Sequence, residues 1–315
     1  MLPIVRASWP GSMQSALAAT LTTPAWWAMS LAAFLVRGGI LLIVLPIIAL
    51  PTPAGVISGF SPFIEALVLG SPSLAGAILG AMLITLLILA LAWAGMAGAW
   101  LDLSMVREAA ASEELDLAYE PTAISSWRAF GLRLAAHIPT FLALAYAVVR
   151  IVFVAYAQFT SPEDPGVPVV DRVIGRVPDA LGLVLVAWLF GEVVGALAAR
   201  RAAAGMSNGS ALAGSIRQLL APRGLATFLV TTAILLAVAL PFALAAQRAW
   251  EHVRGYLLGG VDPMQLGAAV VVLVATWVLG LTIIGAALAL RATAWTAEAT
   301  ARTAPQATPA EAIAA

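Results

Sequence analysis

Three charged residues interrupt long apolar stretches and are the first candidates for a functional site: Arg37, Arg150 and Glu192. Placing a charge at the centre of a bilayer costs at least about 2.5–3.5 kcal/mol on insertion scales, so such residues are candidates for a functional role. Arg37 and Glu192 are expected to lie at similar depths in the membrane. There they could line a polar cavity and bind an anionic or protonatable solute, with the Glu192 carboxylate exchanging protons. The alternative, which we favour, is a buried ion pair that fixes helix register, because the sequence offers few other polar groups at mid-membrane. Arg150 lies nearer the outer surface, where its long side chain reaches the interface or the segment 172–179.

Other catalytic and cofactor chemistry has few candidates in this chain. The absence of cysteine excludes thiolate metal sites and cysteine nucleophiles, and the two histidines, His137 and His252, leave little for metal or haem ligation. We interpret His137 as an interfacial hydrogen-bonding residue and His252 as an exposed one. All 16 basic residues are arginine and they balance 16 acidic residues, which argues against a nucleic-acid partner. With no catalytic triad or phosphate-binding loop, we expect no enzyme activity, no cofactor and no metal.

The elements that position the charged residues are membrane helices. Of the 315 residues, 62% are hydrophobic and 10% are charged, and the mean hydropathy of +0.99 is too high for a water-soluble domain. Continuous apolar runs, rich in Leu and Ala, are long enough to cross about 30 Å of hydrocarbon as helices. These six runs are 26–50, 74–100, 134–158, 181–199, 224–246 and 266–290. The sequence therefore predicts an all-α, polytopic membrane protein with six transmembrane helices.

The distribution of arginine predicts the orientation of these helices. Ten arginines fall in the N-terminus, the loops 101–133 and 200–223, and the C-terminus, whereas four fall in the opposite loops. Because arginine is enriched in cytoplasmic loops, both termini are predicted to be cytoplasmic, in a bacterial inner membrane. No small-residue cleavage site closes the first apolar stretch, so we expect the first helix to be retained.

An internal repeat is the most informative feature of the sequence. The second helix of each predicted hairpin carries a tryptophan followed by two spaced glycines. The three sets are Trp93, Gly95 and Gly98; Trp188, Gly191 and Gly195; and Trp277, Gly280 and Gly285. Since small residues let membrane helices approach closely, we interpret these as helix-packing positions. Chance recurrence in a glycine-rich apolar sequence is the alternative.

A short segment with large apolar residues at helical spacing precedes each hairpin and predicts a cytoplasmic interfacial helix. Met13, Leu17 and Leu21 mark the first of these segments. A proline at each junction would bend the chain toward the bilayer. The junction prolines are Pro24, Pro139 and Pro222. The predicted fold is a single transmembrane domain over residues 1–291, built from three repeated hairpins, each preceded by its interfacial helix, with pseudo-threefold symmetry. The repeats cover about 11–100, 122–201 and 207–291, and a flexible cytoplasmic tail follows over 292–315.

The helix count, the hydropathy pattern and the interfacial segments resemble those of uncharacterised bacterial six-helix membrane proteins. These include the membrane-anchor domain that precedes the catalytic domain of some bacterial glycerophosphodiester phosphodiesterases. The resemblance covers residues 11–291, and the phosphodiesterase catalytic domain has no counterpart in this chain. The resemblance therefore implies a membrane-embedded fold and no enzymatic role.

These features predict a non-enzymatic integral membrane protein that serves as an accessory, scaffold or assembly subunit of a larger membrane complex. Its expected partners are membrane lipids and other membrane-protein subunits. The alternative is a small-solute or lipid transporter that uses Arg37, Glu192 and Arg150. Copurification with a stable partner favours the first function, whereas a water-filled cavity around the charged residues favours the second.

Overall fold

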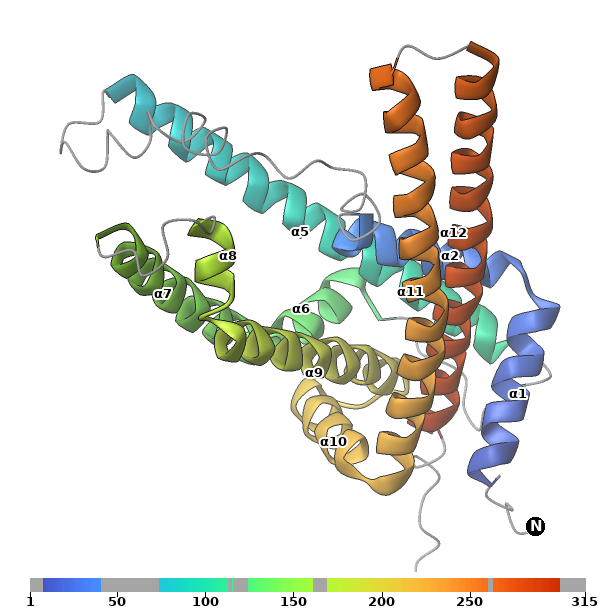
Figure 1. Ribbon diagram of the computed structural model, residues 1–315. Coiled ribbons are helices and arrows are strands. Elements are labelled where there is room, and N and C mark those ends of the chain that lie inside the picture. The colour runs from blue at the N-terminus through green and yellow to red at the C-terminus, as the bar shows by residue number, and fades with distance from the viewer. Residues whose placement is uncertain are drawn as a thin grey trace, which may run out of the picture. The chain divides into compact units, whose positions relative to one another are not determined.

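The structure is a computed structural model that describes residues 8–40, 74–112, 115, 124–160, 169–259 and 263–300. Every regular element among these residues is a helix, as the sequence predicts. In chain order the elements are α1 (Trp9–Thr22), α2 (Ala25–Phe34), the π-helical turn η1 (Leu35–Gly39), α5 (Leu74–Ala110), α6 (Ser126–Ala136), α7 (Ile138–Thr160), α8 (Val169–Ile174), α9 (Pro178–Ala203), α10 (Asn208–Leu220), α11 (Pro222–Gly259) and α12 (Pro263–Thr300) (Figure 1).

Several of these helices are long and apolar enough to cross a membrane. Five qualify, over Gly80–Ala110, Ile138–Gln158, Pro178–Ala203, Pro222–Gly259 and Pro263–Ala299. The number becomes six if Trp9–Thr22 and Ala25–Arg37, which meet at 99°, form one broken span. The first predicted span, 26–50, is described only as far as residue 40, and its remainder lies outside the described residues. The prediction of an all-helical chain with several potential membrane spans is confirmed.

The chain divides into two compact units. Unit 1 comprises Met1–Ile47, Met96–Arg133 and Val193–Ala315, and unit 2 comprises Ile48–Gly95 and Leu134–Glu192. Helices α5 and α9 each contribute residues to both units. The single domain predicted over residues 1–291 therefore stays a prediction.

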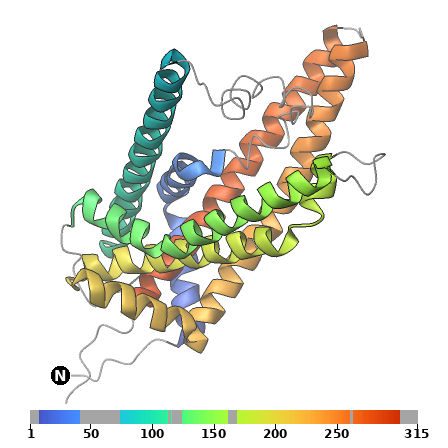
Figure 2. The same ribbon diagram turned by 90° about the vertical axis from the view of Figure 1, so that its left-hand side faces the viewer.

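Helix α12 is central to the packing of unit 1. It forms an antiparallel hairpin with α11, and its C-terminal part contacts α1 and α2 (Figures 1 and 2). Trp26, Ala289 and Ala294 are buried in this contact, and the Oγ1 atoms of Thr20 and Thr293 lie 3.0 Å apart. The small side chains of α12 let the other helices approach it closely.

A second cluster in unit 1 joins α5, α6, α9 and α10. Its buried residues are mostly alanine, among them Ala99, Ala129, Ala198 and Ala211, so the four helices meet with little side-chain volume between them. The turn from α9 to α10 passes through Gly205, whose φ of 86° is a left-handed conformation that glycine adopts without steric cost. This turn brings α10 back against the end of α9.

Unit 2 contains the N-terminal part of α5, α7, α8 and the N-terminal part of α9. The side-chain hydroxyl of Thr140 on α7 donates to the carbonyl of Ala187 on α9 at 3.0 Å. Ala147, Val177 and Ala180 form a small buried cluster between the same elements. Helix α7 and this part of α9 lie side by side in both views (Figures 1 and 2).

Burial changes sharply along the long helices. On α5, residues 81–91 are all exposed and almost all apolar, whereas Ala99, Asp102 and Leu103 are buried. On α12, Val271 is 67% exposed and Ala289 is fully buried. Each of these helices therefore has an apolar part that the chain does not cover and a packed part that includes polar side chains.

Helix α12 extends into the segment 292–315 that the sequence predicts to be a flexible tail. Helix α12 continues to Thr300, and Thr293, Ala294 and Trp295 are buried against the rest of unit 1. The prediction of a flexible tail did not anticipate this helical packing of residues 292–300. It relied on the scarcity of large apolar residues, but small Ala and Thr side chains suit a closely packed helix contact. Residues 301–315 lie outside the described residues.

Candidate functional site

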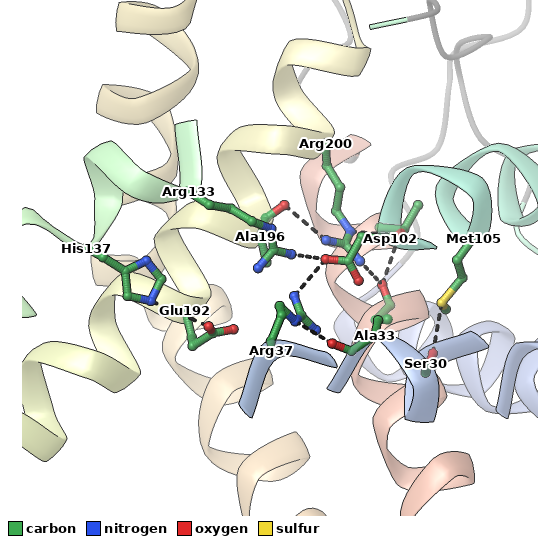
Figure 3. A network of polar contacts seen from close by, with 12 residues as sticks. Ser30, Ala33, Arg37, Asp102, Met105, Arg133, His137, Glu192, Ala196 and Arg200 are labelled. Carbon is green, nitrogen blue, oxygen red and sulfur yellow. Dashed lines mark hydrogen bonds and ion pairs between the residues drawn. The ribbon is translucent and has the colours of Figure 1, made fainter. Parts of the chain in front are cut away.

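Arg37 lies in η1, the π-helical turn that extends α2. Its Nη1 donates to Oδ2 of Asp102 on α5 at 2.8 Å, and its Nε donates to the carbonyl of Ala33 at 2.9 Å (Figure 3). The same Oδ2 accepts a hydrogen bond from Nη2 of Arg133 on α6. We name Arg37, Asp102 and Arg133 the Asp102 cluster. It joins three separate elements of unit 1 through one carboxylate.

The geometry of the Asp102 cluster suits a structural ion pair. The Asp102 and Arg133 side chains are only 11% and 7% exposed, so removal of either charge would leave the other poorly solvated. Charge-assisted hydrogen bonds of this kind are about twice as strong as neutral ones. The cluster thus holds η1, α5 and α6 in one register.

Gly98 makes room for the Asp102 cluster. It lies one helical turn before Asp102 on α5, and a Cβ built at Gly98 would be 2.7 Å from Cγ of Arg37. A side chain at this position would therefore push the Arg37 stem away from α5. Gly98, the last glycine of the first predicted repeat, thus packs closely against Arg37, one of the charged candidate residues.

Glu192 has a protonatable neighbour in unit 2. Its Oε1 lies 3.4 Å from Nε2 of His137, which occupies the junction of α6 and α7. The preceding residue, Gly191, approaches the same junction so closely that a Cβ would lie 2.9 Å from Cδ2 of His137 and 3.1 Å from the Ala136 carbonyl oxygen. The close approach of the α9 backbone therefore brings the carboxylate to the imidazole. The predicted pairing of Arg37 with Glu192 stays a prediction, since the two residues belong to different units.

Arg150 lies on α7 in unit 2, on the exposed side. Its Nη2 is 3.6 Å from Oδ2 of Asp179, and the hydroxyl of Tyr146 lies 3.3 Å from the same carboxylate oxygen. The Arg150 and Asp179 side chains are 41% and 52% exposed. Arg150 thus reaches the segment 172–179 considered in the sequence analysis, but in a well-solvated ion pair.

The remaining members of the predicted tryptophan and glycine pattern have varied environments. Trp93 is 69% exposed and Trp188 is 38% exposed, whereas the Trp277 ring contacts Phe242 edge to face. A Cβ at Gly280 would overlap the Phe242 ring, and one at Gly285 would lie 2.8 Å from the Trp27 carbonyl oxygen. Gly95 is half-buried and Gly195 is buried. Most of these glycines lie where neighbouring residues pack closely against the helix, whereas the three tryptophans have no common environment.

A second polar cluster in unit 1 was missed by sequence reasoning. Its members are Arg201, Gln218, Glu298, Arg223 and Ser12, which we name the Gln218 cluster. The guanidinium of Arg201 donates to the Gln218 side-chain oxygen at 2.8 Å, and the Gln218 amide donates to the Glu298 carbonyl at 2.6 Å. Arg223 joins the Glu298 carboxylate at 2.7 Å and the Ser12 hydroxyl at 2.8 Å. These residues connect α9, α10, α12, α11 and α1.

The neighbouring Arg200 is also buried. Its Nε donates to Thr296 Oγ1 at 2.9 Å, and its Nη2 donates to the Ala292 carbonyl at 3.1 Å. In the sequence, Arg200 and Arg201 count as ordinary cytoplasmic loop charges. One signal was available, because an arginine follows the last glycine in each of the three predicted repeats.

The described side chains do not gather into a metal centre. Among the residues that the structure describes, no group of three or more His, Cys, Asp or Glu side chains could hold a metal ion. Comparison of the chain with protein-family models, with curated proteins and with solved structures found no match to any of them. The resemblance to the membrane-anchor domain of some glycerophosphodiester phosphodiesterases therefore stays an expectation from the sequence.

Proposed function

We propose that the chain is a non-enzymatic integral membrane protein that acts as an accessory, scaffold or assembly subunit of a larger membrane complex. The observation that carries this proposal is the uncovered apolar surface of the α11–α12 hairpin. In the most apolar window of each of these helices, only 6% of the residues are buried within the chain. Such a surface needs lipids or the helices of another subunit to cover it.

The proposed placement is in a bacterial cytoplasmic membrane, with both termini cytoplasmic and three repeated hairpins. The order of elements supports the repeats, because a short helix followed by two long ones recurs from α6 to α9 and from α10 to α12. Helices α1, α6 and α10 occupy the three segments predicted to be interfacial. Leu17 and Leu21 of α1 are exposed, as contact with a lipid interface would require.

The contacts that the charged residues make favour a role in holding the helices together over a catalytic role. Asp102 binds two guanidiniums at once, and the Gln218 cluster connects five helices, so these polar groups contribute to fixing helix positions. Buried and hydrogen-bonded polar groups of this kind help to specify one arrangement of helices. A scaffold needs such rigidity, because its exposed faces must keep a fixed geometry to bind a partner.

The test is purification of the native protein in nanodiscs, followed by mass spectrometry of the proteins that accompany it at fixed ratio. A photo-reactive residue at Val271, which is 67% exposed, should crosslink to one of these proteins. The same residue at Ala294, which is 1% exposed, should crosslink only within the chain. Recovery of the protein without any stoichiometric partner, and crosslinks from Val271 to lipid alone, would contradict the subunit role.

A second candidate function is transport of a small solute or lipid, coupled to protons. The contact of Glu192 with His137 favours it, because two groups that exchange protons lie together in a segment predicted to reach the membrane. Uptake by vesicles containing the protein should then fall with Glu192→Gln and persist with Glu251→Gln, an exposed control on α11. Unchanged uptake in both variants, or none in the wild type, would exclude this mechanism.

A further inference from the structure

An open groove lies between the C-terminal part of α11 and the N-terminal part of α12. Its volume is about 490 Å³, within the range of ligand-binding clefts. It extends from Ala245 to Tyr256 on α11 and from Gln265 to Thr276 on α12. Eleven residue steps correspond to roughly 16 Å of helix, so the groove is long and narrow. None of the charged candidates Arg37, Arg150 and Glu192 lines it.

The two walls of the groove differ in chemistry. The α11 wall presents Arg248, His252 and Tyr256, which are spaced four residues apart and so share one face of the helix. The α12 wall is formed mainly by small apolar side chains. These are Ala268, Ala269 and Val272. A ligand with an anionic group and a flexible apolar chain would match both walls.

The space in the groove has a local cause in the sequence. Alanine at positions 249, 268 and 269 supplies little side-chain volume where the helices face one another. Pro241 lies four residues before Ala245, inside α11, where it removes a backbone hydrogen bond and weakens the helix. Thr276 donates its hydroxyl to the Val272 carbonyl at 2.8 Å, so this donor is satisfied within its own helix.

The position of Arg248 along α11 corresponds to a headgroup level. The apolar run of this helix lies between Arg223 and Arg248, a separation of 25 residues or roughly 37 Å, close to the hydrocarbon core plus its boundaries. Trp250 and Tyr256 follow, and such aromatic residues concentrate at the membrane interface. Arg248 is thus the charged side chain that directly follows the apolar run at this end of the hairpin, at the level where a lipid phosphate would lie.

Arg248 is available for an anion. Among the described residues, its guanidinium forms no ion pair with a carboxylate. The acidic residue nearest to it in sequence, Glu251, lies outside the groove lining and accepts a hydrogen bond from Gln247 at 3.2 Å. A guanidinium matches the geometry of phosphate oxygens through two parallel N–H groups. Arg254 adds a second positive charge nearby without lining the groove.

We propose that this groove binds an anionic phospholipid, with its phosphate at Arg248 and an acyl chain along the alanine wall of α12. The inference depends on the proposed membrane insertion and is independent of the subunit role. It identifies a specific lipid site, whereas the exposed apolar faces elsewhere would meet lipids without selectivity. Phosphatidylglycerol is a suitable probe, with phosphatidylcholine as the neutral comparison.

The test is native mass spectrometry of the purified full-length protein, with either lipid added at increasing concentration. Phosphatidylglycerol should bind one copy per chain more tightly than phosphatidylcholine. Arg248→Gln should weaken this binding about tenfold, as expected for the loss of charge-assisted hydrogen bonds. The matched control Arg254→Gln, on the same helix, should stay within about twofold of the wild type because Arg254 does not line the groove.

A second pair of variants tests the apolar wall without changing the charge. Ala269→Leu places a larger side chain in the groove and should displace the lipid, whereas Val270→Leu, one residue away and outside the lining, should not. Equal effects of Arg248→Gln and Arg254→Gln would overturn the site. Equal binding of the two lipids would do the same. Competition by inorganic phosphate as effective as that by the lipid would identify a free-anion site instead and would also overturn the proposal.

Discussion

The carboxylate of Asp102 should contribute more to stability than any exposed charge of the protein. Its Oδ2 lies 2.8 Å from Nη1 of Arg37 and also binds Nη2 of Arg133. Asp102→Asn keeps the shape of the side chain but removes the charge that the two guanidiniums share. Breaking a buried ion pair in this way costs about 3–5 kcal/mol, because the remaining charge has lost its partner in a poorly solvated place.

The matched control for this substitution is Asp179→Asn, which also removes a carboxylate from an arginine. The Asp179 side chain is 52% exposed and its partner Arg150 is 41% exposed, so water solvates both after the change. Exposed pairs of this kind contribute about 0–1 kcal/mol. The same chemical change should therefore have very different effects at the two positions.

The assay is thermal unfolding in a mild detergent. The quantity measured is the fraction of protein that remains monodisperse at each temperature. At about 2 °C per kcal/mol, Asp102→Asn should lower the apparent Tm by roughly 6–10 °C, and Asp179→Asn by less than about 2 °C. Adding Arg133→Met to Asp102→Asn should cost less than the sum of the two single changes, because both remove the same pair. Equal, small shifts for both aspartate variants would refute the structural role of the Asp102 cluster.

Two further predictions concern glycines, each with a control on the same or an adjoining element. Gly285→Ala should destabilise by about 1–3 kcal/mol, because its Cβ would lie 2.8 Å from the Trp27 carbonyl oxygen, whereas Gly267→Ala has open space and should be neutral or stabilising in the same thermal assay. Gly205→Ala should cost about 1–2 kcal/mol, because an alanine is strained at a φ of 86°. Gly209→Ala, in open space at the start of α10, should not lower the Tm, and a loss as large as that of Gly205→Ala would contradict this account.

Hydropathy was sufficient to predict the helices, because the requirement for a long apolar run depends on the bilayer and not on the tertiary structure. The positions of α7, α9, α11 and α12 follow from this alone. The segments before the hairpins were also identifiable, since apolar residues at helical spacing preceded a proline. The packing of these segments against other helices could not be predicted in this way. Gln218 on α10 is buried by α9 and α12, two helices whose proximity no local pattern encodes.

The partners of the charged residues could not be predicted for the same reason. Arg37 was identified from its position inside an apolar run, but its partner Asp102 lies in a segment that looked like the start of a polar loop. The continuation of α5 to Ala110 changes that interpretation, because the helix carries Asp102 into the packed part of unit 1. His137 was similarly assigned an interfacial hydrogen bond, and its carboxylate neighbour Glu192 is 55 residues away in the chain.

The contacts within unit 1 also bear on the proposed repeats. Asp102, which follows the first predicted repeat, binds Arg133 of the second, and Arg201 of the second binds Gln218 of the third. Thr293 of α12, which follows the third predicted repeat, contacts Thr20 of the first. Within unit 1, polar contacts therefore link residues in or next to each pair of the three predicted repeats. Each of these three contacts is polar, while the exposed apolar faces are left for lipids or other subunits, so assembly within the chain and assembly with partners would use different chemistry.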